Sequence, residues 1–552
     1  MTRRIRTMLG LFALALAACS GQPAAHHHAG AGGAAPPMLL DGLGSYHQTI
    51  TTPSREAQAY FDQGLRLVYG FNHVEAEHAF REAVRLDPVC AMCYWGIALS
   101  QGSNYNSPTD AERENAAFAA IQQAVVLGGR VTERERAIIE ALSKRHADTP
   151  SAQRATLDRA YADAMREVSR RFPDDLDAAT LFADSLMNLR PWNLWKPDGT
   201  MQPETPEILA TLERVIRTNP DHPGALHLYI HAVEAGPDPR RGEAAADRLV
   251  PLMPGAGHMV HMPSHIYWRV GRYADAVDVN VAAVKADRAY LAKRQGSLIY
   301  RGLYYPHNLD FIWHSASMQG RGAETIRAAR EFAETASPAM LREMPDMETA
   351  AAAPLVALAR FGRWEEILRQ PAPLPEFPYV TGAWHYARGL AFAATGRRAE
   401  AEAELAAIQR IAGGVAPDRS LAFFFKAKAM LDLAANVLAG EIAARSGQTD
   451  VAVRHLVAAV AEQDGHWFTE PPPWYFPVRQ SLGAALLSGG RPVEAEAVYR
   501  DDLKRNPENG WSLYGLTQSL RAQGKTGEAD AAQARFRKAW AQADVTLSAS
   551  RF

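Results

Sequence analysis

Apolar and small residues recur along this chain at the intervals expected of paired helices. Near the C-terminus the pattern repeats every 34 residues: Leu482 matches Leu516, Gly490 matches Gly524, and Ala495 matches Ala529. Near the other end Gly64, Ala76, Phe80 and Pro88 have the spacing of Gly483, Ala495, Tyr499 and Pro507. Strand signals are nearly absent. The pattern predicts about twelve helix pairs between residues 54 and 542, each covering the apolar face of its neighbours.

A 34-residue unit of two helices, with small residues where the helices cross and proline at the exit, resembles the tetratricopeptide repeat. The resemblance implies an all-α, right-handed solenoid over residues 54–552, with a concave groove lined by the first helix of each unit. It also implies a fold that commonly holds peptides or partner proteins in that groove.

Three segments in the middle of the chain place metal-binding side chains on one helical face. Residues three, four and seven positions apart lie over one another on an α-helix, and apolar residues occupy the opposite side. The repeat register implied by the resemblance turns nearly all of these positions toward the groove. The three sets are His227, His231 and Glu234; His258, His261 and His265; and His307, Asp310 and His314.

These nine side chains predict a transition-metal site. Neutral imidazole binds Zn, Cu, Fe and Ni, and added carboxylates favour Zn or non-haem Fe over Cu(I). Nine ligands exceed one coordination sphere, so either two or three ions bind or some residues orient the ligands. The alternative is that the histidines cap helices, bond to backbone carbonyls, or bind a polar ligand without metal.

Prolines set the expected helix starts. Pro223 and Pro306 lie where the first and third segments should begin, because proline is tolerated in the first helical turn. Pro263 lies inside the second segment. If that helix begins near Met262, then His258 and His261 lie on the preceding loop.

Cys90 and Cys93 form a Cys-Ala-Met-Cys motif that lacks the following histidine of covalent haem attachment. In an exported protein a local disulfide is the simplest expectation. A redox or soft-metal site is the alternative, since a helix N-terminus lowers thiol pKa. Among the aromatic residues, Trp268 and Trp313 are expected to flank the groove and to contact an organic or peptide ligand.

The N-terminus has the features of an export signal. Three arginines precede an apolar stretch, and Leu16-Ala17-Ala18-Cys19 resembles a bacterial lipobox. The resemblance implies a signal peptide over residues 1–19 and lipidation of Cys19. It also implies an outer-membrane lipoprotein that faces the periplasm or the cell surface. Residues 20–53, rich in Gly, Ala and Pro, are expected to form a flexible tether.

Composition narrows the function further. The 552-residue chain has a formal net charge of −2, which gives no basic excess for nucleic-acid binding. It has no Gly-rich phosphate loop, no Gly-x-Ser-x-Gly and no His-Glu-x-x-His. Two functions remain. The first is a metal-binding solenoid, a class that includes metal-dependent enzymes. The second is a peptide- or protein-binding scaffold in the cell envelope without catalysis.

Overall fold

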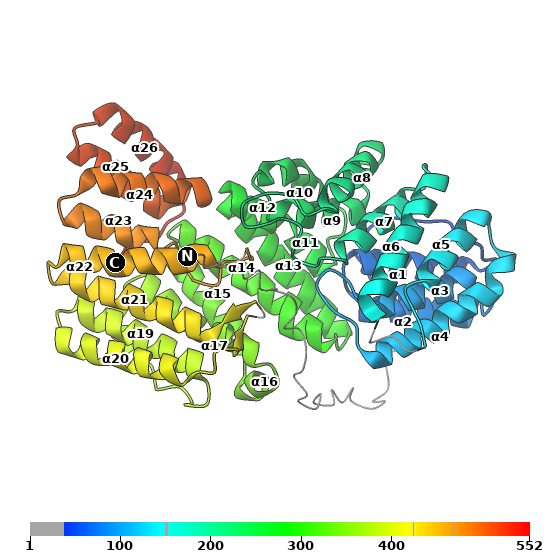
Figure 1. The fold of residues 1–552 in the computed structure, drawn as a ribbon, viewed down its shortest axis with the longest axis horizontal. Coiled ribbons are helices and arrows are strands. Elements are labelled where there is room, and N and C mark those ends of the chain that lie inside the picture. Colours follow the sequence, from blue (N-terminus) through cyan, green and yellow to red (C-terminus); the bar gives the residue numbers. More distant parts are fainter. Residues whose placement is uncertain (1–37, 149–152, 423, 467) are drawn as a thin grey trace, which may run out of the picture. The chain divides into compact units, whose positions relative to one another are not determined.

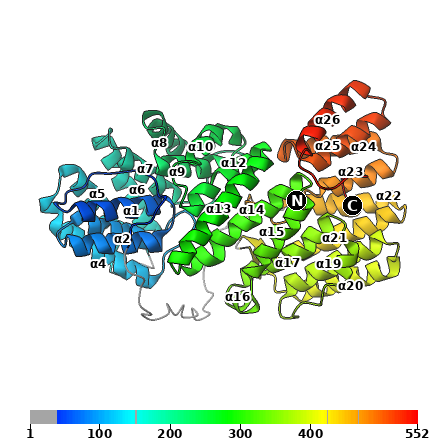
Figure 2. The same ribbon diagram turned by 180° about the vertical axis from the view of Figure 1, so that it is seen from behind.

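The computed structural model describes residues 38–148, 153–422, 424–466 and 468–552. These residues form a nearly all-helical chain, and successive helices lie side by side in chain order (Figures 1 and 2). The prediction of an all-α helical-repeat fold is confirmed. The predicted signal peptide, Cys19 and the first part of the tether lie outside the described residues.

The first half of the chain holds helices α1 to α13. Their bounds are α1 (Arg55–Tyr69), α2 (His73–Leu86), α3 (Ala91–Gln101), α4 (Ala111–Leu127), α5 (Glu133–Ser143), α6 (Arg154–Arg171), α7 (Leu176–Met187), α8 (Thr205–Thr218), α9 (Pro223–Glu234), α10 (Glu243–Leu249), α11 (Gly257–His261), α12 (Pro263–Val270) and α13 (Tyr273–Lys293). Short helical turns are η1 (Gly128–Arg130) and η3 (Pro239–Gly242).

The second half holds helices α14 to α26. Their bounds are α14 (Tyr305–Met318), α15 (Gly322–Glu334), α16 (Pro338–Glu343), α17 (Glu348–Arg360), α18 (Trp364–Leu368), α19 (Pro378–Ala394), α20 (Arg398–Gly414), α21 (Ala427–Arg445), α22 (Thr449–Gly465), α23 (Arg479–Ser488), α24 (Pro492–Arg505), α25 (Gly510–Ala522) and α26 (Thr526–Ala539). Helical turns η4 (Tyr300–Tyr304) and η5 (Pro345–Met347) and a hairpin of β1 (Ser420–Leu421) with β2 (Phe425–Lys426) complete the described elements.

The repeated glycines allow helices to cross closely. The ring of Phe80 lies between Gly64 of α1 and Gly96 of α3, where an added Cβ would come within 2.6 Å and 2.4 Å of the ring. Tyr499 occupies the equivalent place between Gly483 of α23 and Gly515 of α25. An aromatic side chain from the second helix of a unit therefore fills the space that two glycines leave, which explains the spacing seen in the sequence.

Two apolar cores meet on α13. Ala276, Val279 and Tyr290 pack into a core built from the preceding helices, whereas Val277 and Val284 pack into a core built from the following ones. A long helix with apolar residues on two faces can serve both layers, because residues one position apart point about 100° from each other. The histidine-bearing helices α9, α11, α12 and α14 lie on either side of α13 in the sequence.

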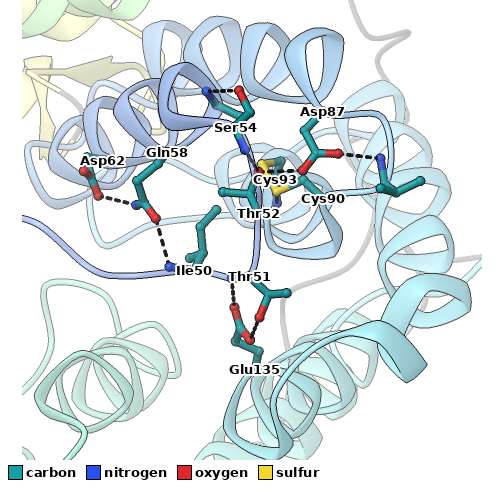
Figure 3. The surroundings of a disulfide bond; sticks show 12 residues. Ile50, Thr51, Thr52, Ser54, Gln58, Asp62, Asp87, Cys90, Cys93 and Glu135 are labelled. Carbon is teal, nitrogen blue, oxygen red and sulfur yellow. Dashed lines mark hydrogen bonds between the residues drawn. A yellow bond between two sulfur atoms is a disulfide. The ribbon is translucent and has the colours of Figure 1, made fainter.

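Residues 38–53, which composition assigned to the tether, lie against the helices. Leu43 and Ile50 are buried, and Gly255 donates a backbone hydrogen bond to Gly42. Thr51 donates from its backbone and its hydroxyl to the carboxylate of Glu135 (Figure 3). Among the described helices, none is both long and apolar enough to cross a membrane.

Candidate metal centre

Four helices bring seven of the nine expected residues together. Helix α9 supplies His227, His231 and Glu234; α11 supplies His258 and His261; α12 supplies His265; and α14 supplies His307. Helices α9 and α14 begin with proline in the first turn, as expected. Helix α11 ends at His261 and α12 begins at Pro263, so His258 and His261 lie on a short helix of their own rather than on a loop.

The ligand-capable atoms fall into three overlapping groups. One group joins His227, His231 and His258, and a second joins His261, His265 and His307. Within each group the candidate atoms all lie within 4.8 Å of one another. The third group, His231, Glu234 and His265, connects the first two. All of these side chains except that of His307, which is half-buried, are at most 4% exposed.

Hydrogen bonds at Nδ1 fix which ring nitrogen is free. Nδ1 of His227 lies 2.5 Å from the carbonyl oxygen of Tyr69, and Nδ1 of His261 lies 2.7 Å from Oδ1 of Asn280. Asn280 in turn donates from its Nδ2 to the Ala276 carbonyl, which orients the amide. Because these partners are acceptors, Nδ1 carries the proton and Nε2 keeps its lone pair.

Glu234 accepts hydrogen bonds at Nδ1 from two further histidine rings. Its Oε1 lies 3.0 Å from Nδ1 of His231, and its Oε2 lies 2.6 Å from Nδ1 of His265. The third group is therefore a carboxylate that accepts from two imidazoles and orients them, rather than a separate ligand set. The Nε2 atoms of His261 and His265 are then 2.8 Å apart. Nε2 of His227 and of His231 has no hydrogen-bond partner among the described residues.

Glu470, which the sequence interpretation did not select, completes the surroundings of His265. It lies between α22 and α23, and its Oε2 is 2.6 Å from Nδ1 of His265. Burial would lower the pKa of His265, but the charges of Glu470 and Glu234 raise it to about 10. Burial raises the pKa of Glu470 to about 7. The only sequence signal was an acidic residue directly before three prolines.

The other histidines of the centre are held as neutral rings. Burial, together with the neighbouring histidines, lowers the pKa of His227, His258 and His261 well below the ordinary value. Burial also lowers the pKa of His231, and it lowers that of His307 to about 3. Neutral imidazole is the protonation state that a transition metal requires.

Aromatic residues with unusual backbone conformations cover the centre. Phe71 has φ 55° and Trp192 has φ 59°, the left-handed region that residues other than glycine seldom adopt. The Phe71 ring lies 4.5 Å from His227 and stacks on His231, and Trp192 packs edge-on against His231. Tyr105 adds a contact to the same ring. Strained backbone of this kind gathers at functional sites.

Asp310 and His314 are not part of the centre, contrary to expectation. Neither belongs to any of the three groups; instead Asp310 accepts from Trp313 and lies 3.1 Å from Nδ1 of His314. His307 and His314 face the same way, but seven residues of helix span about 10 Å, too far for one small cluster. Phe311 packs against His261 and His265 and fills the space between.

The remaining expected residues lie elsewhere. Cys90 and Cys93 are joined in a buried disulfide at the start of α3 (Figure 3). Neither belongs to a metal-capable group among the described residues. Trp313 is buried in the second core, and Trp268 packs against Tyr273 and His314.

Comparisons with known proteins add little. No family model matches the sequence, and no curated protein matches it. Among solved structures, a human IFIT1 dimer with m7Gppp-AAAA is 12% identical with a TM-score of 0.31, covering 89% of this chain and 91% of that chain. The Cut9–Hcn1 hetero-tetramer of APC/C is 12% identical with a TM-score of 0.29, covering 89% and 78%. Scores this low carry no argument, so the fold rests on the chain's own helices.

Proposed function

We propose that this protein binds two transition-metal ions, one at His227, His231 and His258 and the other at His261, His265 and His307. The observation that carries the proposal is that the two nitrogens of four of the rings differ in their partners. Nδ1 of His227, His231, His261 and His265 is occupied by a carbonyl, an amide or a carboxylate. Nε2 of His227 and of His231 has no partner among the described residues, and the Nε2 atoms of His261 and His265 are 2.8 Å apart, where a bound metal ion would displace the second proton of His265. A buried ring nitrogen without a partner is costly unless something binds it.

The ligand set indicates which metals fit. Imidazole suits Zn, Cu, Fe and Ni, and Glu234 and Glu470 act here on Nδ1 atoms rather than as ligands. An all-imidazole set therefore favours Zn or Cu over non-haem iron, which commonly uses a carboxylate ligand. Three histidines also leave a position open on a four-coordinate ion, where water or a substrate can bind.

We propose that the protein is exported to the cell envelope, as the sequence predicts. A buried disulfide suits an oxidising compartment, which agrees with export and with an anchor at Cys19. The protein would then be a lipid-anchored helical-repeat protein of the cell envelope. A peptide- or protein-binding scaffold without catalysis is the alternative, in which the histidine cluster would hold no metal.

The test is the metal content of the full chain, prepared without a histidine tag and measured by plasma mass spectrometry. We expect about two equivalents of Zn or Cu per chain. His227→Ala and His307→Ala should each remove about one equivalent, because they belong to different groups. A single shared ion would instead be lost in both variants.

His455→Ala is the matched control. His455 is bonded through Nδ1 to Asn436, as His261 is to Asn280, but it belongs to no metal-capable group. It should leave the metal content unchanged. A wild-type chain that retains no metal and takes up none tightly would refute the proposal and favour the scaffold, with pull-downs from envelope extracts as the next step.

A further inference from the structure

A buried carboxylate of α13, that of Asp287, contacts three segments next to the metal centre. Helix α13 packs against α11, α12 and α14. Asp287 is completely buried and lies seven residues after Asn280, so the two side chains share one face of α13. Asn280 already holds Nδ1 of His261. The face of α13 that orients one candidate ligand therefore extends to Asp287.

Both carboxylate oxygens of Asp287 accept hydrogen bonds from the segments that follow α13. Oδ1 accepts from the hydroxyl of Tyr300, the first residue of η4, at 2.5 Å. Oδ2 accepts from Nδ2 of Asn308 in α14 at 2.6 Å. Asn308 directly follows His307, and it is 1% exposed. Asp287 thus fixes α14 at the turn that carries a ligand of the second group.

The third contact of Asp287 is with the backbone at the start of α11. A Cβ added to Gly257 would lie 1.7 Å from Oδ1, so the carboxylate occupies the place of a side chain there. The next residue is His258, and Tyr304 at the end of η4 packs on that ring with 4.6 Å between the centroids. Asp287 therefore touches the chain neighbour of His258, which belongs to the first group, and of His307, which belongs to the second.

This carboxylate is costly to bury. Burial raises the pKa of Asp287 to about 7, and among the described residues the groups that oppose the shift are the neutral Tyr300 and Asn308 rather than a cation. An apolar side chain would avoid that cost if the position only had to be filled. What the carboxylate adds is a pair of directed hydrogen bonds between α13, η4 and α14.

We infer that Asp287 is a positioning residue for both metal ions. It holds α11 and α14 against α13 so that His258 reaches the first group and His307 reaches the second. Asp287 is not a ligand, because it belongs to none of the metal-capable groups of the described residues. The inference deepens the proposed function and rests on it, since the helices that it positions are those that carry the candidate ligands.

The experiment loads the full chain with Co²⁺ in competition with a chromophoric chelator and records the visible d–d absorption, which reports the coordination geometry. Asp287→Leu should weaken the binding of both ions about tenfold and change the absorption, because the rings lose their alignment. Asp287→Asn should bind nearly as the wild type does. It keeps an acceptor for Tyr300, and the amide of Asn308 can turn to offer its Oδ1, which has no partner among the described residues. Recovery with asparagine but not with leucine is a result that loss of packing alone does not give.

Asp502→Leu is the matched control. Asp502 of α24 is also completely buried and accepts from Ser512, Asn506 and Asn509, none of which is the chain neighbour of a candidate ligand. Its replacement should lower the midpoint of thermal unfolding, as Asp287→Leu does, while leaving the Co²⁺ affinity and absorption unchanged.

Gly257→Ala tests the same contact from the other side, and it decides the question if Asp287→Leu does not fold. The new Cβ would displace the carboxylate, so Co²⁺ binding should weaken here too. A wild-type chain that binds no metal refutes the proposed function and this inference together. If the wild type binds metal, the inference alone is overturned by unchanged affinity in folded Asp287→Leu or Gly257→Ala, by no recovery with asparagine, or by an equal loss in Asp502→Leu.

Discussion

At the scale of single residues, the difference between a structural and a ligating histidine lies in how many ring nitrogens the protein uses. His222 is fully buried and uses both: Nδ1 accepts from the Ala225 backbone as a helix cap, and Nε2 lies 3.0 Å from the hydroxyl of Tyr46. His227 and His231 use only Nδ1. That contrast, rather than burial, separates these two candidate ligands from His222; His258 of the same group uses neither ring nitrogen within the described part of the chain.

His146 is a third case, and we expect it to make the folded state less stable in acid. Neither of its nitrogens has a partner among the described residues. Burial and the charges of Arg145 and Arg154 lower the pKa of His146 to about 3. Its unfolded pKa is near 6.5, so the folded state binds fewer protons between about pH 3 and 6.5. The stability it supports is complete above pH 6.5 and is lost as the pH falls.

We therefore expect His146→Leu to reduce the loss of stability on acidification. One pKa unit corresponds to about 1.4 kcal/mol, so at pH 5 the depressed pKa of His146 lowers the free energy of unfolding by about 2 kcal/mol. The difference in thermal midpoint between pH 8 and pH 5 should be smaller in the variant than in the wild type. An equal difference in both proteins would contradict the assigned cause.

At the scale of elements, the repeat is maintained by close helix crossings. The sequence interval between Gly483 and Tyr499 matches that between Gly64 and Phe80, and in both places the ring occupies the space that a Cβ would need. The periodicity therefore reports a packing requirement that recurs at both ends of the chain. It also explains why helix-forming propensity alone would choose alanine at these positions and be wrong.

Gly483→Ala should destabilise the C-terminal repeats. The new Cβ would lie 2.4 Å from the Tyr499 ring, and overpacking of this kind typically costs about 1–3 kcal/mol. Thermal unfolding followed by circular dichroism would show a lower midpoint. Gly413→Ala, in α20 with no atom within 4 Å of the added Cβ, should be neutral or slightly stabilising. Equal effects in the two variants would exclude the packing explanation.

At the scale of the whole described chain, the metal centre depends on segments far apart in sequence. His265 of α12 is held by Glu234 of α9 and by Glu470, which comes from the segment between α22 and α23. Asn280 of α13 and the backbone of Tyr69 hold two further rings. The segment between α22 and α23 thus completes a site whose candidate ligands all come from α9, α11, α12 and α14.

Glu470→Gln is therefore expected to weaken metal binding although Glu470 is not a ligand. Loss of a carboxylate that orients a ligating histidine typically lowers metal affinity about 10- to 100-fold. Competition titration with a chromophoric chelator measures the change, with helical circular dichroism as the check on folding. Glu462→Gln, whose carboxylate pairs with the neighbouring His466 near the same segment, should have no effect. Unchanged affinity in Glu470→Gln would remove this residue from the centre.

The sequence by itself determined what is local. Helical periodicity placed His227 and His231 on one face, prolines marked where α9 and α14 begin, and the 34-residue interval gave the helix pairs. These features follow from residues within a few turns of one another, which the fixed rise and rotation of a helix relate directly.

Only the tertiary structure decided which faces meet. It brought Glu470 to His265 and placed Asn280 behind His261. It also turned Phe71 and Trp192 onto the histidines through backbone conformations that their residue types do not suggest. The physical reason is that contacts between elements depend on how whole helices pack, and a helical stripe specifies a direction but not the partner that it meets.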